Sequence, residues 1–314
     1  MTRGPARGGA IAEIATPLAS RRGQIYRVSR NLVGYLYLAP ALVLFGLFAW
    51  YPILRGIVLA FQRADLISTP QWNGLANFTY VVQDPVFFKA WGNTFALTGL
   101  VLLIGFVIPI VLAVAINEMK HGQWYFRLAF YIPAMLPPIV IALLWKWIYD
   151  PSQGLANAML GLLGLGPQPW LQSPDQAMIS IVLILVWGGT GFTMLIFLAS
   201  LQDISAEQYE AAELDGANLF QRLRYITLPN IRVITLVLLI LAIIGAMQTF
   251  VEPFAISNNG GPNNATVTVV LLMYRYAFEF NNVGAASALG LILFAVLTAL
   301  SAGYLWLTKR LSRV

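Results

Sequence analysis

Residues 210–229 read EAAELDGANLFQRLRYITLP and separate two strongly apolar stretches of the chain. Charged residues are scarce elsewhere, because Asp, Glu, Lys and Arg make up only 10% of the 314 residues, whereas 59% are hydrophobic. Soluble domains are about 45–50% apolar. The composition therefore predicts a membrane protein, and the polar segment is the place where we expect it to meet a soluble partner.

The first half of this polar segment is predicted to be a short helix over about 206–214, since Ala, Glu, Gln and Leu favour helix. Ser205 is its expected N-cap, with Gln208 at the capping-box position. Asp215 and Gly216 should end it, because glycine accepts the positive φ of a helix C-terminus. The sequence therefore predicts a sharp turn at Gly216.

A second helix is predicted over about 218–227. It places Phe220 on one face and Arg222 with Arg224 toward the other. Pro229 lacks an N–H and is expected outside the helix interior. The segment is thus predicted to fold as helix, turn and helix before the next apolar stretch. On the residues alone, an ordinary amphipathic surface helix between membrane spans is the alternative interpretation.

The same spacing resembles the cytoplasmic loop of permease subunits in binding-protein-dependent ABC importers, of the maltose and glycerol-phosphate type. The matching pattern is Glu-Ala-Ala, three residues, Gly, nine residues, Ile, one residue and Leu-Pro, and Asp-Gly-Ala is the form of the sugar-importing branch. Leu223 departs from the pattern, where an aromatic residue is common. The resemblance implies a coupling helix that sits in a groove of an ATPase subunit. The residues that it assigns to ATPase coupling are Glu210, Ala211, Ala212, Asp215, Gly216, Ala217, Ile226, Leu228 and Pro229.

Six apolar stretches are each near the roughly 20 residues that span a bilayer. They cover about 32–54, 93–117, 126–149, 176–201, 231–256 and 284–307. The resemblance implies an all-α integral membrane protein with six transmembrane helices and a cytoplasmic coupling helix, the type I ABC importer permease fold. We expect a basic cytoplasmic tail, 1–31, and a permease domain, 32–314, whose coupling loop is 203–230.

Lys and Arg are distributed unevenly between the two sides of the predicted membrane. With the N-terminus inside, most of them lie on the cytoplasmic side, and the loop from about 150 to 175 has none. This bias predicts that both termini lie in the cytoplasm. The resemblance implies a multi-pass protein of the cytoplasmic (inner) membrane of a bacterium or archaeon. The charge count does not use the loop motif, yet it places the loop on the side of an ATPase.

Further stretches resemble the sugar permeases, so that the resemblance covers roughly 34–310. Asn77, Asp84-Pro85 and Asn93-Thr94 match the region between the first two core helices, and Asn259-Gly260-Gly261-Pro262 matches a loop after the penultimate helix. The chain resembles the compact six-helix relatives, without two extra N-terminal helices and a large periplasmic insertion.

Polar and small residues within the fourth and fifth spans are the candidates for a substrate pathway. Gln248 and Glu252 lie four residues apart on the fifth span and are expected on one helical face. The glycines next to Trp187 are expected to break the fourth span. Glu252 is expected to pair with Lys146 or Arg275, or else to meet the delivered substrate or binding protein. Helix packing through small residues is the alternative. The candidate pathway residues are Trp187, Gly188, Gly189, Phe192, Gly245, Ala246, Gln248 and Thr249.

Several function classes are disfavoured by the sequence. It contains no Cys and one His, so we expect no metal site, and it shows no catalytic constellation or Walker lysine loop. Nucleic acid is a poor fit, because basic residues sit at helix ends. The resemblance implies a non-catalytic subunit that carries a sugar, oligosaccharide or polyol and binds no cofactor, with ATP and Mg on the ATPase. Its partners would be a second permease, two ATPase subunits, a periplasmic or lipid-anchored binding protein and membrane lipid. An autonomous ion-coupled transporter is the alternative, and a membrane-embedded enzyme a third class.

Overall fold

The computed structural model describes residues 35–311. The predicted tail, 1–31, and Arg313 lie outside the described residues. The chain divides into two compact units, residues 1–56 and 57–314.

Long apolar helices dominate the described part of the chain. Five are long and apolar enough to cross a membrane, and a sharply bent pair of helices gives a sixth candidate. They are Tyr35–Leu59, Pro85–Glu118, Pro174–Gln202, Arg232–Ala255 and Val283–Arg310, with the pair Gln123–Met135 and Pro138–Ile148. Each of them overlaps one of the six predicted spans.

Short elements connect the first two spans. The first span contains a π-helical turn, η1 (Gly46–Trp50), and ends in α2 (Tyr51–Leu59). An antiparallel hairpin of β1 (Gln62–Arg63) and β2 (Gln71–Trp72) follows, with Gln62 opposite Trp72. The next elements are α3 (Ala76–Gln83), α4 (Pro85–Gly105) and α5 (Val107–Glu118).

The third span is bent far more sharply than a single helix over 126–149 would be. It consists of α6 (Gln123–Met135) and α7 (Pro138–Ile148), which meet at 99°. Pro137 and Pro138 explain the bend, because a proline lacks the N–H for an intrahelical bond and disfavours helical geometry in the residue before it. The apolar stretch predicted over 126–149 is therefore a bent pair of helices.

The fourth span is a single helix, α9 (Pro174–Gln202), preceded by α8 (Leu155–Leu162) and η2 (Trp170–Gln172). The prediction that its glycines break the helix is wrong. Gly191 instead lets α9 approach α6 closely, since a Cβ built on it would overlap the carbonyl oxygen of Phe130. This glycine permits helix packing, as small residues commonly do in membrane bundles.

The fifth span is the one that breaks. Helix α13 (Arg232–Met247) ends before Gln248, and a short α14 (Val251–Ala255) follows. Thr268 donates a hydrogen bond of 2.8 Å to the carbonyl of Thr249, which the break leaves without a helical partner. Because of this break, the prediction that Gln248 and Glu252 share one helical face is wrong. The chain continues as η4 (Pro262–Asn264), α15 (Val269–Tyr274), η5 (Arg275–Glu279) and α16 (Val283–Leu311).

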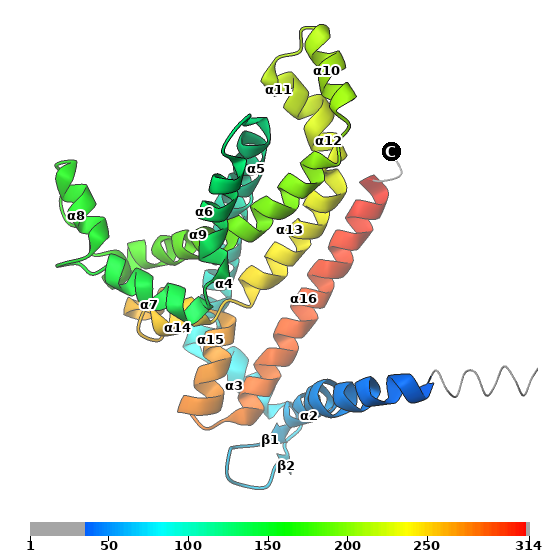
Figure 1. Cartoon of the computed structure of the whole chain (residues 1–314). Coiled ribbons are helices and arrows are strands. Elements are labelled where there is room, and N and C mark those ends of the chain that lie inside the picture. Colours follow the sequence, from blue (N-terminus) through cyan, green and yellow to red (C-terminus); the bar gives the residue numbers. More distant parts are fainter. Residues whose placement is uncertain (1–34, 312–314) are drawn as a thin grey trace, which may run out of the picture. The chain divides into compact units, whose positions relative to one another are not determined.

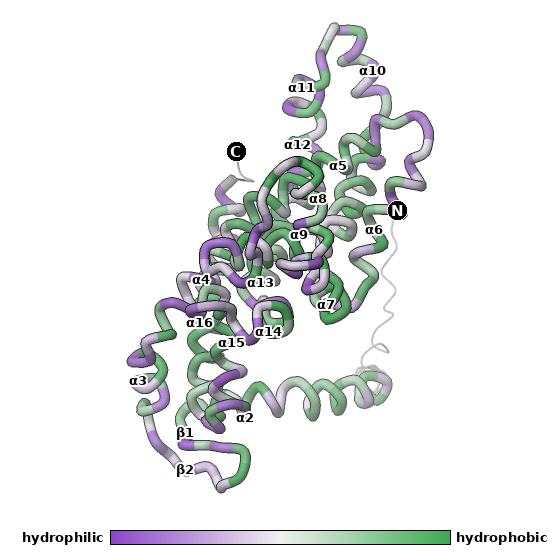
Figure 2. The backbone as a smooth tube through the Cα atoms, turned by 90° about the vertical axis from the view of Figure 1, so that its left-hand side faces the viewer, coloured by the Kyte–Doolittle hydropathy of each residue, from purple (hydrophilic) through white to green (hydrophobic). Residues whose placement is uncertain are grey.

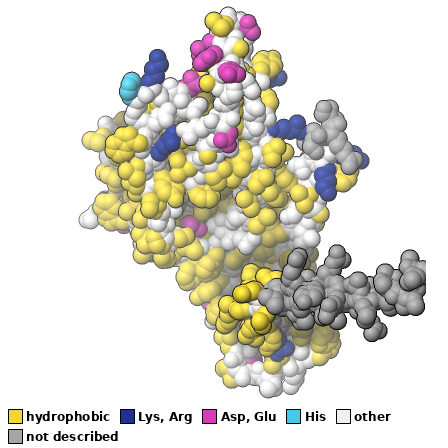
Figure 3. Space-filling model, turned by 45° about the vertical axis from the view of Figure 1, so that its right-hand side comes forward, with side chains coloured by type: hydrophobic (Ala, Val, Ile, Leu, Met, Phe, Trp, Pro, Cys, Tyr) yellow, Lys and Arg dark blue, Asp and Glu magenta, His cyan; other side chains and the backbone are white. Residues whose placement is uncertain are grey.

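Polar elements lie at opposite ends of the second unit (Figure 1). One end, the loop end, carries α10 (Ala206–Leu214), α11 (Leu219–Arg222), η3 (Leu223–Thr227) and α12 (Leu228–Asn230). The other, the hairpin end, carries β1, β2 and α3. Hydrophobic positions concentrate in the long helices between them (Figure 2). Acidic side chains gather at the loop end, beyond a broad hydrophobic belt (Figure 3).

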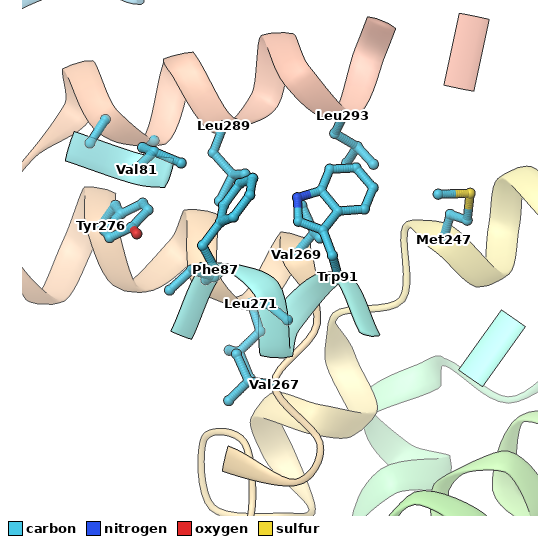
Figure 4. Packing of buried hydrophobic residues seen from close by; sticks show 14 residues of the cluster. Val81, Phe87, Trp91, Met247, Val267, Val269, Leu271, Tyr276, Leu289 and Leu293 are labelled. Carbon is cyan, nitrogen blue, oxygen red and sulfur yellow. The ribbon is translucent and has the colours of Figure 1, made fainter. Parts of the chain in front are cut away.

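Four clusters of buried residues hold the described part of this unit together, and two of them pack the helices next to its polar ends. In the first, Phe87 and Trp91 of α4 point toward Leu289 and Leu293 of α16 (Figure 4). In the second, residues of α5, α9 and α13 pack at the loop end. The buried members of this second cluster are Ala113, Ile116, Met194, Phe197, Leu198, Leu201, Ile231 and Leu238. The helices that flank the polar loop are therefore fixed to α5.

Asn77 fixes the hairpin end and gives a first test of the fold. Its buried amide donates to the carbonyls of Ala60 (2.9 Å) and Gln62 (2.8 Å). We expect Asn77→Ala to lower the free energy of unfolding by about 1–3 kcal/mol, because two buried carbonyls lose their donor. The measurement is the melting temperature in detergent. Asn73→Ala, which removes only a bond of 3.4 Å to Asn77, is the control and should melt close to the wild type.

Candidate coupling loop and membrane pathway

The turn after α10 has the hydrogen bonds of a Schellman motif. The N–H of Ala217 donates to the carbonyl of Ala212 (2.9 Å), and the N–H of Gly216 donates to that of Glu213 (3.0 Å). Gly216 has φ 77°, a left-handed conformation that glycine adopts without strain. The helix over 206–214 and the turn at Gly216 are thus confirmed. These bonds join Ala212 to the residue after Gly216, so the motif's spacing between Ala212 and Gly216 is the one that this turn requires.

The capping box lies at the second helix rather than the first. Ser205 makes no side-chain cap, so the prediction of a capping box with Gln208 is wrong. Asn218 accepts from the N–H of Gln221 (2.9 Å), while the Gln221 side chain accepts from the N–H of Asn218 (2.8 Å). Asn followed three residues later by Gln was the sequence signal for this cap. The reciprocal bonds fix the direction in which α11 leaves the turn.

The second helix does not end before Pro229. It continues from α11 through the π-helical η3 into α12, with Pro229 in the first turn of α12. The predicted helix end near 227 is therefore wrong, whereas Pro229 lies in the first turn of α12, a position that proline tolerates. In a regular α-helix the ring of Pro229 would clash with the carbonyl oxygen one turn earlier. The wider π-helical turn η3 comes just before Pro229 and relieves this clash. The Tyr209 hydroxyl of α10 forms a hydrogen bond of 3.0 Å with the hydroxyl of buried Thr227, and this bond holds the two helices of the loop together.

The two arginines of the second helix point in different directions. Arg222 is turned inward, with 15% of its side chain exposed, and forms ion pairs with Glu213 of α10 and Glu118 of α5. Arg224 is exposed and lies over the ring of Tyr225. The prediction that both arginines share a polar face is wrong, because the carboxylates draw Arg222 toward the bundle. Glu118 lies far from Arg222 in the sequence, so the sequence alone did not predict this contact.

The rest of the loop presents an exposed surface. Glu210, Ala211 and Asp215 are exposed, and so are Leu228 and Pro229. Ala212, Ala217 and Ile226 are half-buried. Large apolar side chains stand beside the charged ones, and they are Leu214 (90% exposed), Leu219, Phe220 and Tyr225. Exposed apolar side chains next to charges are typical of a protein interface.

A cavity of ≈ 420 Å³ lies between the spans and contains three of the predicted pathway residues. Gly188, Gly189 and Phe192 of α9 line it, opposite Leu241 and Ala242 of α13. Its other lining residues are Val101, Gly105, Phe106, Ala134, Leu185, Val186, Thr190, Thr193 and Leu238. No heavy atom lies within 4 Å of a Cβ built on Gly189, so this position faces open space in the described chain.

The other five candidates do not line this cavity. Trp187 packs edge-on against Trp145 of α7, with ring centroids 5.6 Å apart. Ala246 and Thr249 are buried, whereas Gly245 and Gln248 are exposed at the end of α13. The structure therefore brings three of the four fourth-span candidates together and distributes the fifth-span candidates around the helix break.

Glu252 is buried next to this break, and among the described residues it forms no ion pair with Lys146 or Arg275. Lys146 instead donates to Asn258 (3.4 Å), and Arg275 donates to Asn264 (3.0 Å) and to the carbonyl of Asn259. The prediction of a pair with Lys146 or Arg275 is wrong, because both cations donate hydrogen bonds to side-chain and backbone oxygens of the 258–264 loop instead.

The asparagine-rich loop after α14 is held by hydrogen bonds from neighbouring helices. Asn93 of α4 donates to the carbonyls of Asn264 (2.9 Å) and Val267 (3.0 Å). Gly260 has φ 109° and leaves no room for a Cβ, which would overlap Val267. The residues that resemble sugar permeases here therefore have structural roles within the described chain.

The chain is similar to known transport proteins over most of its length. Residues 105–313 match the family described as "Binding-protein-dependent transport system inner membrane component". The chain is 33% identical to the arabinooligosaccharides transport system permease protein AraP of Bacillus subtilis, over 87% of each chain. It is 33% identical to the diacetylchitobiose uptake system permease protein NgcF of Streptomyces coelicolor, over 88% of this chain and 82% of NgcF.

Solved structures agree with these relatives. A chain of a bacterial ABC transporter that imports the acidic polysaccharide alginate superposes with a TM-score of 0.78 at 25% identity, covering 91% of this chain and 99% of that one. A second structure holds the alginate transporter in complex with an alginate pentasaccharide-bound periplasmic protein, with a TM-score of 0.78 at 26% identity over 92% and 98% of the two chains. The predicted all-α importer permease fold is confirmed.

Proposed function

Since this chain belongs to the family of binding-protein-dependent transport system inner membrane components, we propose that it forms half of the pathway by which an ABC importer takes up a sugar or oligosaccharide. As a permease subunit of this family it is a non-catalytic, multi-pass inner-membrane protein. The names of AraP and NgcF support an oligosaccharide cargo. The proposed partners are a second permease, two ATPase subunits and an extracytoplasmic binding protein. ATP and Mg would be bound by the ATPase subunits.

The projecting loop with its rigid turn is the observation that carries this proposal. The bonds around Gly216 and Asn218 fix the shape of the loop, and Glu210 with Leu214 remains exposed for a partner. In the proposed cycle, closure of the ATPase on ATP displaces the loop and rocks the flanking helices, α9 and α13. Such a two-state element, biased by nucleotide, is the physical form that coupling takes. The loop end would then be cytoplasmic and the hairpin end would face the binding protein.

Co-purification from the native host tests the proposal. The tagged, detergent-solubilised chain should bring with it a second permease, an ATPase and a binding protein, which mass spectrometry identifies. Recovery of the chain alone or as a homo-oligomer would contradict the proposal and favour an ion-driven transporter. The sugar bound to the co-purified binding protein names the cargo.

The cavity on α9 gives a prediction for the pathway. Gly189→Leu should reduce uptake by about tenfold or more, because a branched side chain fills space through which the substrate would pass, and 1.4 kcal/mol already corresponds to a factor of ten. Assembly should persist, since no atom lies near this position in the described chain. Uptake is measured in cells with the sugar found on the binding protein. Gly161→Leu, on exposed α8 with equally open surroundings, is the control, and equal uptake in both variants would remove this cavity from the pathway.

A further inference from the structure

Arg222 stands where three helices meet. Its Nη2 lies 3.8 Å from Oε2 of Glu118, the last residue of α5, and its Nη1 contacts Oε1 of Glu213 in the last turn of α10. Among residues 35–311, its Nε is buried without a hydrogen-bond partner. The guanidinium is therefore largely removed from water and depends on these two carboxylates.

Both carboxylates occupy positions that their own helices disfavour. The C-terminal end of a helix carries partial negative charge, so an acidic residue in the last turn is repelled. Glu118 and Glu213 both lie in such last turns. A cation between them offsets both repulsions at once. This geometry makes Arg222 a bridge between α5 and α10 rather than a surface charge.

The α5 end of this bridge belongs to a rigid part of the molecule. Ile116, two residues before Glu118, is buried with Leu198 and Leu201 of α9 and Ile231 at the start of α13. The loop leaves the bundle from α9 and returns through α13, and Figure 1 shows α10 and α11 projecting beyond α5. With these two chain connections alone, the projecting coupling loop could pivot about them. The contact with Glu118 adds a lateral support away from both connections.

We propose that Arg222 is a positioning residue that ties the coupling loop to the end of α5. A displacement of α10 would then move the α5–α9–α13 cluster instead of bending the loop. This inference rests on the proposed function, because it says how the same loop transmits the ATPase movement. It predicts that the length and continuity of the bridge matter, and that a covalent link can replace its charges.

The chain contains no cysteine, which allows a direct test. The double variant Glu118→Cys with Arg222→Cys is assembled with its partners in lipid nanodiscs. ATP hydrolysis is measured with and without the binding protein, isolated from its host in the sugar-bound form. We expect the stimulated-to-basal ratio to fall about three- to tenfold, the usual range for losing one coupling contact. A flexible thiol crosslinker, about as long as the two side chains that it replaces, should restore the ratio.

Two controls separate the bridge from other effects. Arg222→Cys alone, treated with the same reagent, should stay uncoupled, since it offers the crosslinker no second thiol. Lys120→Gln removes an exposed charge close to Glu118 and should keep the wild-type ratio.

The outcomes distinguish this inference from the proposed function. A wild-type ratio in the untreated double variant would overturn the bridge. A loss that crosslinking does not restore would also overturn it, because the tie itself would then not carry the movement. A wild-type complex that ignores the sugar-bound binding protein would instead contradict the proposed function.

Discussion

Gly216→Pro is expected to abolish stimulation of ATP hydrolysis by the sugar-bound binding protein, while the chain still inserts and assembles. Proline fixes φ near −65°, whereas Gly216 requires 77°, and it removes the N–H that donates to Glu213. The chain would leave α10 in another direction, so α10 and α11 could not occupy one groove together. The loss should be about tenfold or more, within the range of allosteric coupling energies. The stimulated-to-basal ATPase ratio of the reconstituted complex measures it.

Gly216→Asn is the matched control for this prediction. Asparagine enters the left-handed region more readily than other non-glycine residues, because its short side chain bonds locally. We expect this variant to keep most of the stimulation. Full stimulation in the proline variant would show that the turn has no role in coupling. Equal loss in both variants would show that the side chain, not the backbone angle, is what the partner rejects.

The second large effect is expected at the contact between α6 and α9. Gly191→Ala should destabilise the protein by about 1–3 kcal/mol, as overpacking of a close contact does. Its Cβ would overlap the carbonyl oxygen of Phe130, and the next nearest atoms also belong to the backbone of α6. A backbone cannot rotate away as a flexible side chain can. The melting temperature and the yield of folded protein in detergent should therefore both fall.

Gly189→Ala provides the control on the same helix. It lies two residues away and has no atom within 4 Å of the added Cβ, so its melting temperature should be no lower than that of the wild type. Equal melting temperatures for the Gly191→Ala and wild-type proteins would contradict the close helix contact.

The sequence predicts the regular parts of this fold well. The six apolar stretches coincide with six candidate spans because hydropathy and length alone decide whether a segment can cross a bilayer. The helix over 206–214 and its glycine turn are equally local, since a Schellman motif involves only consecutive residues. These features depend on neighbours in the chain, which a sequence displays directly.

Irregular spans and distant contacts were not predictable in the same way. The break after Met247 is stabilised by Thr268, which lies beyond the span. Its local signal is Pro253, which lacks the N–H that a continuous helix would donate to the Thr249 carbonyl. Conversely, the glycines near Trp187 look like breakers, yet Gly191 serves close packing on α6. The contact between Arg222 and Glu118 could not be predicted from the sequence, because only the folded chain brings α5 beside the loop.

The most direct test of the account is to ask what the exposed loop touches. A single cysteine at Ala211, introduced into this cysteine-free chain, should crosslink to the ATPase subunit of the assembled importer. A cysteine at Ile67, which is 89% exposed at the hairpin end, should give no such adduct. An ATPase adduct from Ala211 and not from Ile67 is the result that we predict. No adduct from Ala211, or an ATPase adduct from Ile67, would contradict the assignment of this loop as the coupling element.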